Sequence, residues 1–198
     1  MIKRAFDIFC SGVALLVLWP VLVIIALWIK TDSSGPVFFR QERVGKNGRI
    51  FRIHKFRTME ANAERKGLQL TVGADNRVTG AGKVLRKSKI DEIPQLLDVF
   101  LGDMSIVGPR PEVPKYIDHY SEAARAKILS VRPGITDRAS IEFRNENEIL
   151  SAARDPETAY ITEIMPIKQK YYCEYADKHS LFGDIKIVID TAVAVIRG

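Results

Sequence analysis

Cysteine and histidine are scarce in this sequence. Its 198 residues include two cysteines and three histidines. Cys10 lies within an apolar run and Cys173 lies far down the chain, so the two predict no disulfide framework. The histidines at positions 54, 119 and 179 are not spaced as metal ligands, and no role follows for them. A disulfide-rich fold and a cysteine or histidine metal site are therefore excluded, and the chain outside the apolar run is compatible with a reducing cytoplasm.

The length and charge of the chain set broad limits. A chain of 198 residues forms one globular domain with appendages more readily than two domains. Lysine and arginine number 30 against 24 aspartate and glutamate, and the sequence pI is about 9.3. This excess of positive charge favours anionic partners such as phosphates, lipid headgroups or nucleic acid, and it does not choose among them.

A long apolar run near the N-terminus is the first structural signal. Residues 8–29 are 22 consecutive uncharged residues. As a helix they would extend roughly 33 Å, enough to cross a hydrocarbon core of about 30 Å. A cleaved signal peptide is less well supported, because the run is long and no small-residue cleavage site follows it before Lys30. We expect the segment to remain in the mature protein.

The position of Pro20 bears on how this segment meets a membrane. A central proline removes a backbone hydrogen bond and kinks the helix. Cationic residues flank both ends, with Lys3 and Arg4 before the run and Lys30 after it, and such flanks favour the cytoplasmic side. We therefore expect residues 1–30 to form a re-entrant helix and residues 31–198 a domain on the cytoplasmic face. A kinked single-pass helix is the alternative, since spanning helices also tolerate proline.

A basic hairpin is predicted directly after the apolar run. Residues 37–44 and 50–56 resemble two strands, and Lys46-Asn47-Gly48 between them is typical of a turn. Positions 40 to 57 carry seven basic residues and one acid, Glu42. Such a face suits lipid headgroups or a phosphate pocket, and a solvated basic face is the alternative. Residues 60–82 lack an apolar period, and they predict a mobile helix and loop over part of a site.

The carboxylate pair Asp91-Glu92 is the most informative local feature. Pro94 is acceptable in the first turn of a helix, and the apolar residues that follow it repeat at helical spacing until Gly102. The pair therefore sits at a helix N-terminus, where exposed amides stabilise anions. Basic residues in the preceding turns should keep Asp91 ionised as a nucleophile or metal ligand. An ordinary helix cap is the alternative.

Two arginines are held between prolines and glycines downstream. One is Arg110 in Gly108-Pro109-Arg110-Pro111, and the other is Arg132 in Arg132-Pro133-Gly134. Rigidly presented guanidinium groups suit recognition of a diphosphate. A pair of purely structural turns explains the same pattern equally well.

The order of these motifs resembles the small monotopic bacterial sugar transferases, the polyprenyl-phosphate phosphoglycosyl transferases that begin the assembly of surface and glycoprotein glycans. The resemblance covers residues 1–136 in ordered motifs and continues more loosely to the C-terminus. The motifs are the proline-broken helix, KFRTM at 55–59, DEIPQL at 91–96, GDMS at 102–105, GPRP at 108–111 and RPGIT at 132–136.

The resemblance implies a reaction and the residues that perform it. Asp91 would attack the sugar-linked phosphate of a UDP-sugar, release UMP and carry the sugar-phosphate covalently until polyprenyl (undecaprenyl) phosphate accepts it. Glu92 would act as a base or orienting group, and Asp91 would also help to hold Mg²⁺. The expected substrate-binding residues near the phosphates are Lys55, Arg86, Arg110 and Arg132. The expected location is the cytoplasmic face of the bacterial inner membrane, in contact with lipid and without nucleic acid.

The sequence departs from the family pattern in two places. Trp19-Pro20 stands where family members often carry Ser-Pro, which removes a serine side chain from the kink. Residues 137–146 differ from the common Gly-x-Ala-Gln-Val pattern, so the identity of the sugar is not given.

The C-terminal third is predicted to be helical. Asp155 caps a helix that begins at Pro156, and residues 159–177 continue in helical style with an interruption at Pro166. Residues 181–196 are apolar around much of the helix but too charged to span a membrane, and they favour a helix packed on the domain or on the bilayer surface. The whole pattern predicts an α+β fold, a mostly helical single domain with a small β-hairpin, an N-terminal re-entrant membrane helix and surface amphipathic helices.

Two other functions are weighed against the transferase. A membrane-tethered basic domain that binds nucleic acid or lipid without chemistry would need neither Asp91 and Glu92 together nor a metal. An aspartyl phosphohydrolase is disfavoured, because two aspartates separated by one residue after a strand are absent from the sequence.

Overall fold

The computed structural model describes residues 2–61, 63 and 75–196. Much of the segment 60–82 that was predicted to cover a site lies outside the described residues. The helices are α1 (Ile2–Asp32), α2 (Gly80–Lys87), α3 (Gln95–Leu101), α4 (Pro114–Ile117), α5 (Glu122–Ile128), α6 (Arg138–Glu142), α7 (Glu146–Ala152), α8 (Pro156–Ala159), α9 (Met165–Lys178) and α10 (Leu181–Ile196), with short helical turns η1 (Lys46–Gly48), η3 (Ile90–Glu92) and η4 (Tyr160–Ile164). The strands are β1 (Phe38–Phe39), β2 (Glu42–Val44), β3 (Ile50–Arg52), β4 (Lys55–Phe56), β5 (Ser105–Val107) and β6 (Gly134–Thr136).

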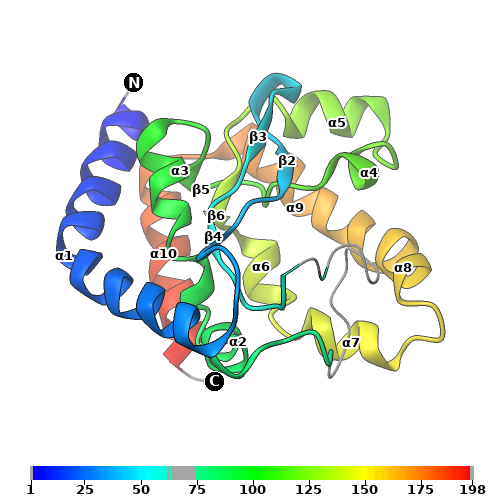
Figure 1. Ribbon diagram of the computed structural model, residues 1–198. Coiled ribbons are helices and arrows are strands. Elements are labelled where there is room, and N and C mark those ends of the chain that lie inside the picture. The colour runs from blue at the N-terminus through cyan, green and yellow to red at the C-terminus, as the bar shows by residue number, and fades with distance from the viewer. Residues whose placement is uncertain (1, 62, 64–74, 197–198) are drawn as a thin grey trace.

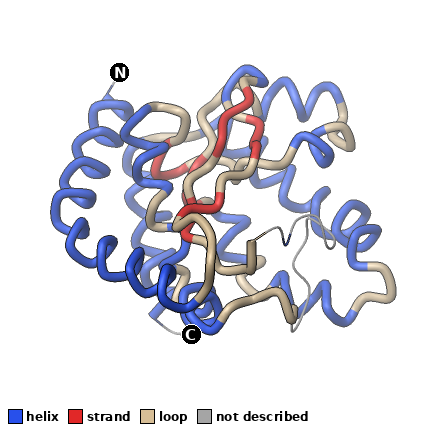
Figure 2. Tube along the Cα trace, viewed as in Figure 1, coloured by secondary structure: helices blue, strands red, loops and turns tan. Residues whose placement is uncertain are grey.

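The strands form three small pairs among the helices (Figure 2), which confirms the predicted α+β class. The predicted hairpin is present as β2 and β3, joined by a turn in which Asn47 and Gly48 have φ values of 57° and 77°. The prediction of two continuous strands was wrong. Each predicted strand is broken into two pieces, and β1 pairs separately with β4. The separate pair brings the segment that carries Lys55 to η3, where Asp91 and Glu92 lie.

The parallel pair of β5 and β6 was not predicted. Its strands are three residues long, with Ser105 opposite Gly134. The chain passes itself so closely here that a Cβ atom on Gly134 would lie 2.1 Å from the backbone nitrogen of Gly108. Glycine is therefore required at this crossing, which fixes the loop that carries Arg110 against the segment after Arg132.

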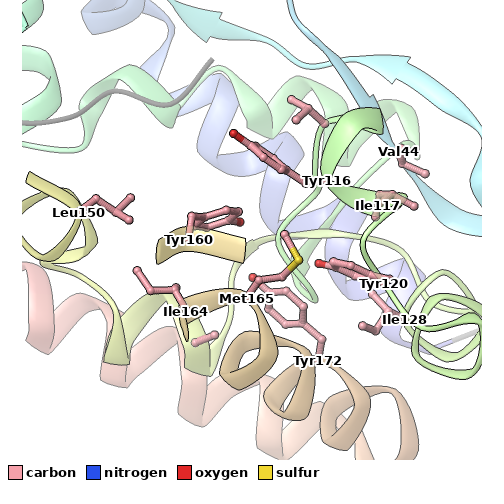
Figure 3. Packing of buried hydrophobic residues seen from close by; sticks show 12 residues of the cluster. Val44, Tyr116, Ile117, Tyr120, Ile128, Leu150, Tyr160, Ile164, Met165 and Tyr172 are labelled. Atoms are coloured by element: carbon pink, nitrogen blue, oxygen red, sulfur yellow. The ribbon is translucent and has the colours of Figure 1, made fainter. Parts of the chain in front are cut away.

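The largest hydrophobic cluster is built mainly by the C-terminal half of the chain. Figure 3 shows Tyr116, Tyr160, Met165 and Tyr172 of this cluster packed together. The rings of Tyr116 and Tyr160 have centroids 5.0 Å apart, and Tyr172 is 1% exposed. The helical C-terminal third therefore supplies core side chains to the same domain that carries the motifs.

Helix α1 is continuous from Ile2 to Asp32 with Pro20 inside it, and Figure 1 shows that it bends along its length. It is long and apolar enough to cross a membrane by length and composition. Its outward side chains are exposed, as at Leu16 with 74% exposure. The two ends of this helix nevertheless contact the same domain.

Polar contacts hold the first turns of α1. The buried carboxylate of Asp7 accepts hydrogen bonds from Ser105 Oγ at 2.9 Å and from the backbone N–H of Ile106 at 3.1 Å. Lys3 Nζ donates to Asp184 of α10 at 2.6 Å. Burying a carboxylate is costly unless it is hydrogen-bonded, so these partners determine where α1 begins on the domain.

Apolar contacts hold the last turns of α1. Ile29 is 1% exposed and packs with Phe56 and Leu85. The carboxylate of Asp32 accepts a hydrogen bond from the backbone N–H of Ala81 at the start of α2. Both ends of the apolar helix are therefore fixed to one body, with the middle left exposed.

Helix α10 has the exposed apolar side that was predicted for the C-terminal segment. Asp184 and Ile187 are buried, whereas Phe182 and Ile189 are 87% and 57% exposed. Helices α1, α3 and α10 lie on one flank of the molecule (Figure 1). Apolar side chains on all three face outward there, which confirms the expectation of amphipathic helices on the surface.

Candidate active site

The candidate site forms where four segments meet. Helix α2 ends at Lys87, and Lys89, with a left-handed φ of 58°, directs the chain into η3, which carries Asp91 and Glu92. Strand β4 lies against η3, and the loop after β5 delivers Arg110 from a distant part of the sequence. Asp91 and Glu92 precede α3 as predicted, but they occupy a separate 3-10 turn.

Glu92 is the centre of an ion cluster. Its carboxylate accepts a hydrogen bond from Lys55 Nζ at 2.7 Å and two from Arg110, of which the bond from Nη1 measures 3.2 Å. Burial by itself would raise the pKa of Glu92, but Arg110 and Lys55 together hold it well below its usual range. Glu92 is thus an ionised group that orients two cations. It is not a free carboxylate poised to take a proton, and of its two expected roles the geometry favours the orienting one.

The pKa values of the two cations in this cluster shift in opposite directions. The carboxylate of Glu92 raises the pKa of Arg110 above its usual value, against the effect of burial. Burial lowers the pKa of Lys55, and the nearby positive charge of Arg110 lowers it further. The carboxylate of Glu92 opposes this shift but does not cancel it. One carboxylate between two cations leaves the cluster with net positive charge, which suits a phosphate ligand.

Asp91 lies beside this cluster in a different environment. It is 9% exposed, and among the described residues none donates a hydrogen bond to its carboxylate. Burial raises the pKa of Asp91, and the positive charges of Lys55, Arg86 and Lys89 only partly oppose the shift. The expectation that basic neighbours keep Asp91 ionised stays a prediction, and burial sets the direction of its pKa shift. A poorly solvated carboxylate without fixed partners has its oxygen lone pairs available for attack on a substrate.

Arg86 lies close to Asp91, as predicted. Its Nε donates to Thr58 Oγ1 at 2.8 Å, and Asp91 counteracts the lowering of the Arg86 pKa by burial. Thr58 was not singled out from the sequence, although its position three residues after Lys55 in KFRTM could have suggested it. This hydroxyl group fixes the direction of the Arg86 guanidinium.

Arg132 has a different partner. Its Nε donates to the carbonyl of Gly102, at the C-terminal end of α3, at 2.9 Å. Within the described ranges, no recorded hydrogen bond or ion pair joins it to Glu92 or Asp91. The structure therefore brings Lys55, Arg86 and Arg110 to the carboxylate pair, and the phosphate-binding role of Arg132 stays a prediction.

The basic residues of the predicted hairpin face have different partners. Arg57 turns to the end of α1, where it donates to the carbonyls of Ser33 and Ser34. Arg43 donates to the carbonyl of Pro111 and so supports the loop of Arg110. Lys55, one of the expected substrate-binding residues, lies at the centre of the site.

A Mg²⁺ ion was predicted at Asp91. Among the described residues, no three histidine, cysteine, aspartate or glutamate side chains gather as a complete ligand set. Mg²⁺ is commonly held by one or two carboxylates together with phosphates of the substrate. Asp91, without a hydrogen-bond partner among those residues, fits a Mg²⁺ that is bound together with a diphosphate.

Comparison with known proteins gives a consistent pattern. The family model described as bacterial sugar transferase matches residues 1–198. The UDP-N-acetylgalactosamine-undecaprenyl-phosphate N-acetylgalactosaminephosphotransferase of Aeromonas hydrophila is 38% identical over 199 residues, which cover 100% of this chain and 44% of that protein. The UDP-glucose:undecaprenyl-phosphate glucose-1-phosphate transferase of Escherichia coli (strain K12) is 38% identical over 194 residues, 96% of this chain and 39% of that protein.

A shorter relative matches over most of its own length. The exopolysaccharide production protein ExoY of Rhizobium meliloti (strain 1021) is 36% identical over 220 residues, which cover 100% of this chain and 88% of that protein. The chain spans less than half the length of the Aeromonas and Escherichia relatives.

Proposed function

The chain belongs to the bacterial sugar transferase family, and from that premise we propose that it is a phosphoglycosyl transferase. It moves a sugar-1-phosphate from a UDP-sugar to undecaprenyl phosphate and releases UMP, the first membrane step of glycan assembly. The observation that carries this proposal is the unpartnered, buried carboxylate of Asp91 beside a cluster in which Glu92 orients Lys55 and Arg110.

The reaction proceeds in two displacements at one phosphorus atom. A carboxylate oxygen of Asp91 attacks the sugar-linked phosphorus, the bond from that phosphorus to the bridging oxygen breaks, and UMP leaves with the bond's electron pair. The sugar-phosphate is then an acyl phosphate on Asp91. A phosphate oxygen of undecaprenyl phosphate attacks the same phosphorus, the bond to Asp91 breaks, and the carboxylate is regenerated.

The cations stabilise the negative charge that develops on the phosphates. Arg110 has five N–H donors and Lys55 has three, so both keep donors free after binding Glu92. Their positions are set by Glu92 before the substrate arrives, and preorganised donors are the effective form of electrostatic catalysis. Arg86, fixed by Thr58, adds a third cation beside Asp91. Asp91 would help to hold Mg²⁺, which would supply further neutralisation of the negative charge on the phosphates.

The attachment of α1 supports a re-entrant arrangement. Asp7 near the start of the helix is bonded to β5, and Asp32 at its end is bonded to α2. Two ends that are fixed to the same domain do not lie on opposite sides of a hydrocarbon core of about 30 Å. We therefore place residues 1–30 in the membrane as a re-entrant helix and residues 31–198 on the cytoplasmic face of the inner membrane.

A covalent adduct tests the proposed function. The purified protein is incubated with Mg²⁺ and UDP-glucose or UDP-N-acetylgalactosamine, the donors suggested by the relatives' names. Without a lipid acceptor, intact-mass spectrometry should show a gain of one sugar-phosphate, and peptide mapping should place it on Asp91. With undecaprenyl phosphate, UMP should accumulate catalytically.

Matched variants complete this test. Asp91→Asn should abolish both adduct and turnover, because a neutral amide is a poor nucleophile and a poor metal ligand. Asp118→Asn, at an exposed carboxylate outside the site, should leave both unchanged. Turnover without any adduct would indicate a single displacement, and retained turnover in Asp91→Asn would refute the nucleophile. A binding domain without chemistry would show neither signal with any UDP-sugar.

A further inference from the structure

His54 has a fixed hydrogen-bond partner on each side of its imidazole ring. Its Nδ1 lies 2.6 Å from Oδ1 of Asp98 in α3, and its backbone N–H donates to Oδ2 of the same carboxylate at 2.8 Å. Its Nε2 lies 2.5 Å from Nη1 of Arg40. Asp98 is 1% exposed, and the His54 side chain is 15% exposed. The ring is therefore held between a buried anion and a cation.

These partners determine which ring nitrogen donates and which accepts a hydrogen bond. A guanidinium group has N–H donors and no acceptor, so Nε2 of His54 has to accept from Arg40. Nδ1 then carries the proton and donates to Asp98. The guanidinium of Arg40 has little freedom to turn away, because its Nη2 donates to the carbonyl of Arg52 at 3.0 Å. A proton on Nε2 would set two N–H donors against each other.

The ring lies next to the candidate active site. His54 directly precedes Lys55, and Asp98 follows Glu92 in the same helical region of the chain. His54 is bonded to Asp98, and Lys55 is bonded to Glu92 at 2.7 Å. Two consecutive residues are thus tied to two carboxylates of the η3–α3 region. The contact at His54 fixes the register in which the Lys55 ammonium meets Glu92.

We propose that His54 is a positioning residue for the transfer reaction: its Nδ1–H bond to Asp98 aligns Lys55 with Glu92. The catalytic part of this inference rests on the proposed function. Among the described residues, the charged groups that face the ring are Arg40 from the β1–β2 connection and Asp98 from α3. The ring of Phe38 packs edge-on against it, with centroids 6.1 Å apart.

Two substitutions separate the contacts of the ring. The amide nitrogen of His54→Asn lies where Nδ1 lies, so this variant keeps a donor to Asp98 and loses the acceptor for Arg40. The amide oxygen of His54→Gln reaches the place of Nε2, so this variant keeps the acceptor and loses the donor to Asp98. Neither side chain titrates. His119→Gln, which removes an exposed imidazole far along the chain, is the control.

The first measurement is kcat/KM at pH 8 for the parent, the two His54 variants and the control. At pH 8 we expect His54→Asn to stay within about threefold of the parent and His54→Gln to fall about tenfold or more, a factor that corresponds to about 1.4 kcal/mol. His119→Gln should match the parent. Equal losses in the two His54 variants would overturn the positioning role, since only His54→Asn keeps the donor to Asp98.

The second measurement needs no turnover. In protein labelled with ¹⁵N-histidine, the imidazole resonances missing from His54→Asn identify His54, and their shifts should report the neutral Nδ1–H tautomer at pH 8. An Nε2–H tautomer would overturn the inference, even if the Gln variant failed to fold. If the parent turned over no UDP-sugar, the proposed function and the positioning role would fail together, while the spectrum would still decide the hydrogen bonding of the ring.

Discussion

Replacing Glu92 by glutamine keeps the size of the side chain but removes the negative charge that faces Lys55 and Arg110. The side chains of these three residues are 18%, 16% and 31% exposed. Removing one partner of a buried ion pair costs about 3–5 kcal/mol, whereas an exposed pair contributes about 0–1 kcal/mol. For this partly buried cluster we expect a loss of about 2–4 kcal/mol in the free energy of unfolding, between those limits. Release of the proton from Lys55 limits the loss, because burial already lowers its pKa.

Thermal unfolding in detergent micelles, followed by far-UV circular dichroism, measures this effect. In a chain of this length 1 kcal/mol shifts the Tm by about 2–4 °C, so the Glu92→Gln variant should melt about 4–16 °C below the parent. The control is Asp177→Asn, which breaks the surface pair of Lys127 and Asp177 at 2.8 Å, with side chains 44% and 49% exposed. Asp177→Asn should cost at most about 1 kcal/mol. Equal shifts in the two variants would refute the reasoning from burial.

The pH dependence of stability is a second test of the stabilising role of the Glu92 charge. The pKa of Glu92 in the folded protein lies well below its ordinary value of 4.5. Its charge therefore stabilises the fold fully above the unfolded pKa, and this stabilisation is lost as the pH falls from about 4.5 through the lower folded value. The gap in stability between the parent and Glu92→Gln should be constant near neutral pH and shrink below about pH 4.5. If the difference in stability between the parent and Glu92→Gln widened on acidification, the inference that folding lowers the pKa of Glu92 would be wrong.

Four further outcomes follow from the structure. Asp91→Asn should be at least as stable as the parent at pH 7.5, because burial raises the pKa of Asp91 and an amide has no charge to desolvate; a lower Tm would contradict this. Arg110→Ala should lower kcat/KM by about 2–4 kcal/mol of transition-state stabilisation, and near-normal activity would make this arginine structural. Asp7→Asn should lower the free energy of unfolding by about 1–3 kcal/mol, since the buried carboxylate accepts two hydrogen bonds at the start of β5, and thermal unfolding measures this. Cysteines introduced at Ile2 and Ser33 should both resist a membrane-impermeant thiol reagent added outside intact cells, and periplasmic labelling at position 2 would establish a spanning helix.

Features that depend only on neighbouring residues were predictable from the sequence. The apolar run with Pro20 predicted a long helix that bends, because length, hydrophobicity and a central proline act locally. The turn at Asn47-Gly48 was predictable because these residues tolerate a positive φ. The carboxylate pair was found for the same reason, since Pro94 and the helical spacing after it place Asp91 and Glu92 before a helix.

Pairings between distant segments were decided by the tertiary structure. Arg110 bonds to Glu92 across 18 positions, and Ser105 bonds to Asp7 across 98 positions. No periodicity encodes such contacts, because they depend on how separate elements pack together. The parallel pair of β5 and β6 escaped prediction for this reason, as did the partner of Arg132 at Gly102.

The sequence determined which ionisable groups the site contains, and the fold decided how each of them behaves. Asp91 and Glu92 are neighbours in the same turn, yet burial raises the pKa of one and two cations lower the pKa of the other. Charge counts along the chain predicted that basic neighbours would keep Asp91 ionised. That stays a prediction, but desolvation raises the pKa of Asp91, and desolvation depends on side chains that only folding brings together around it.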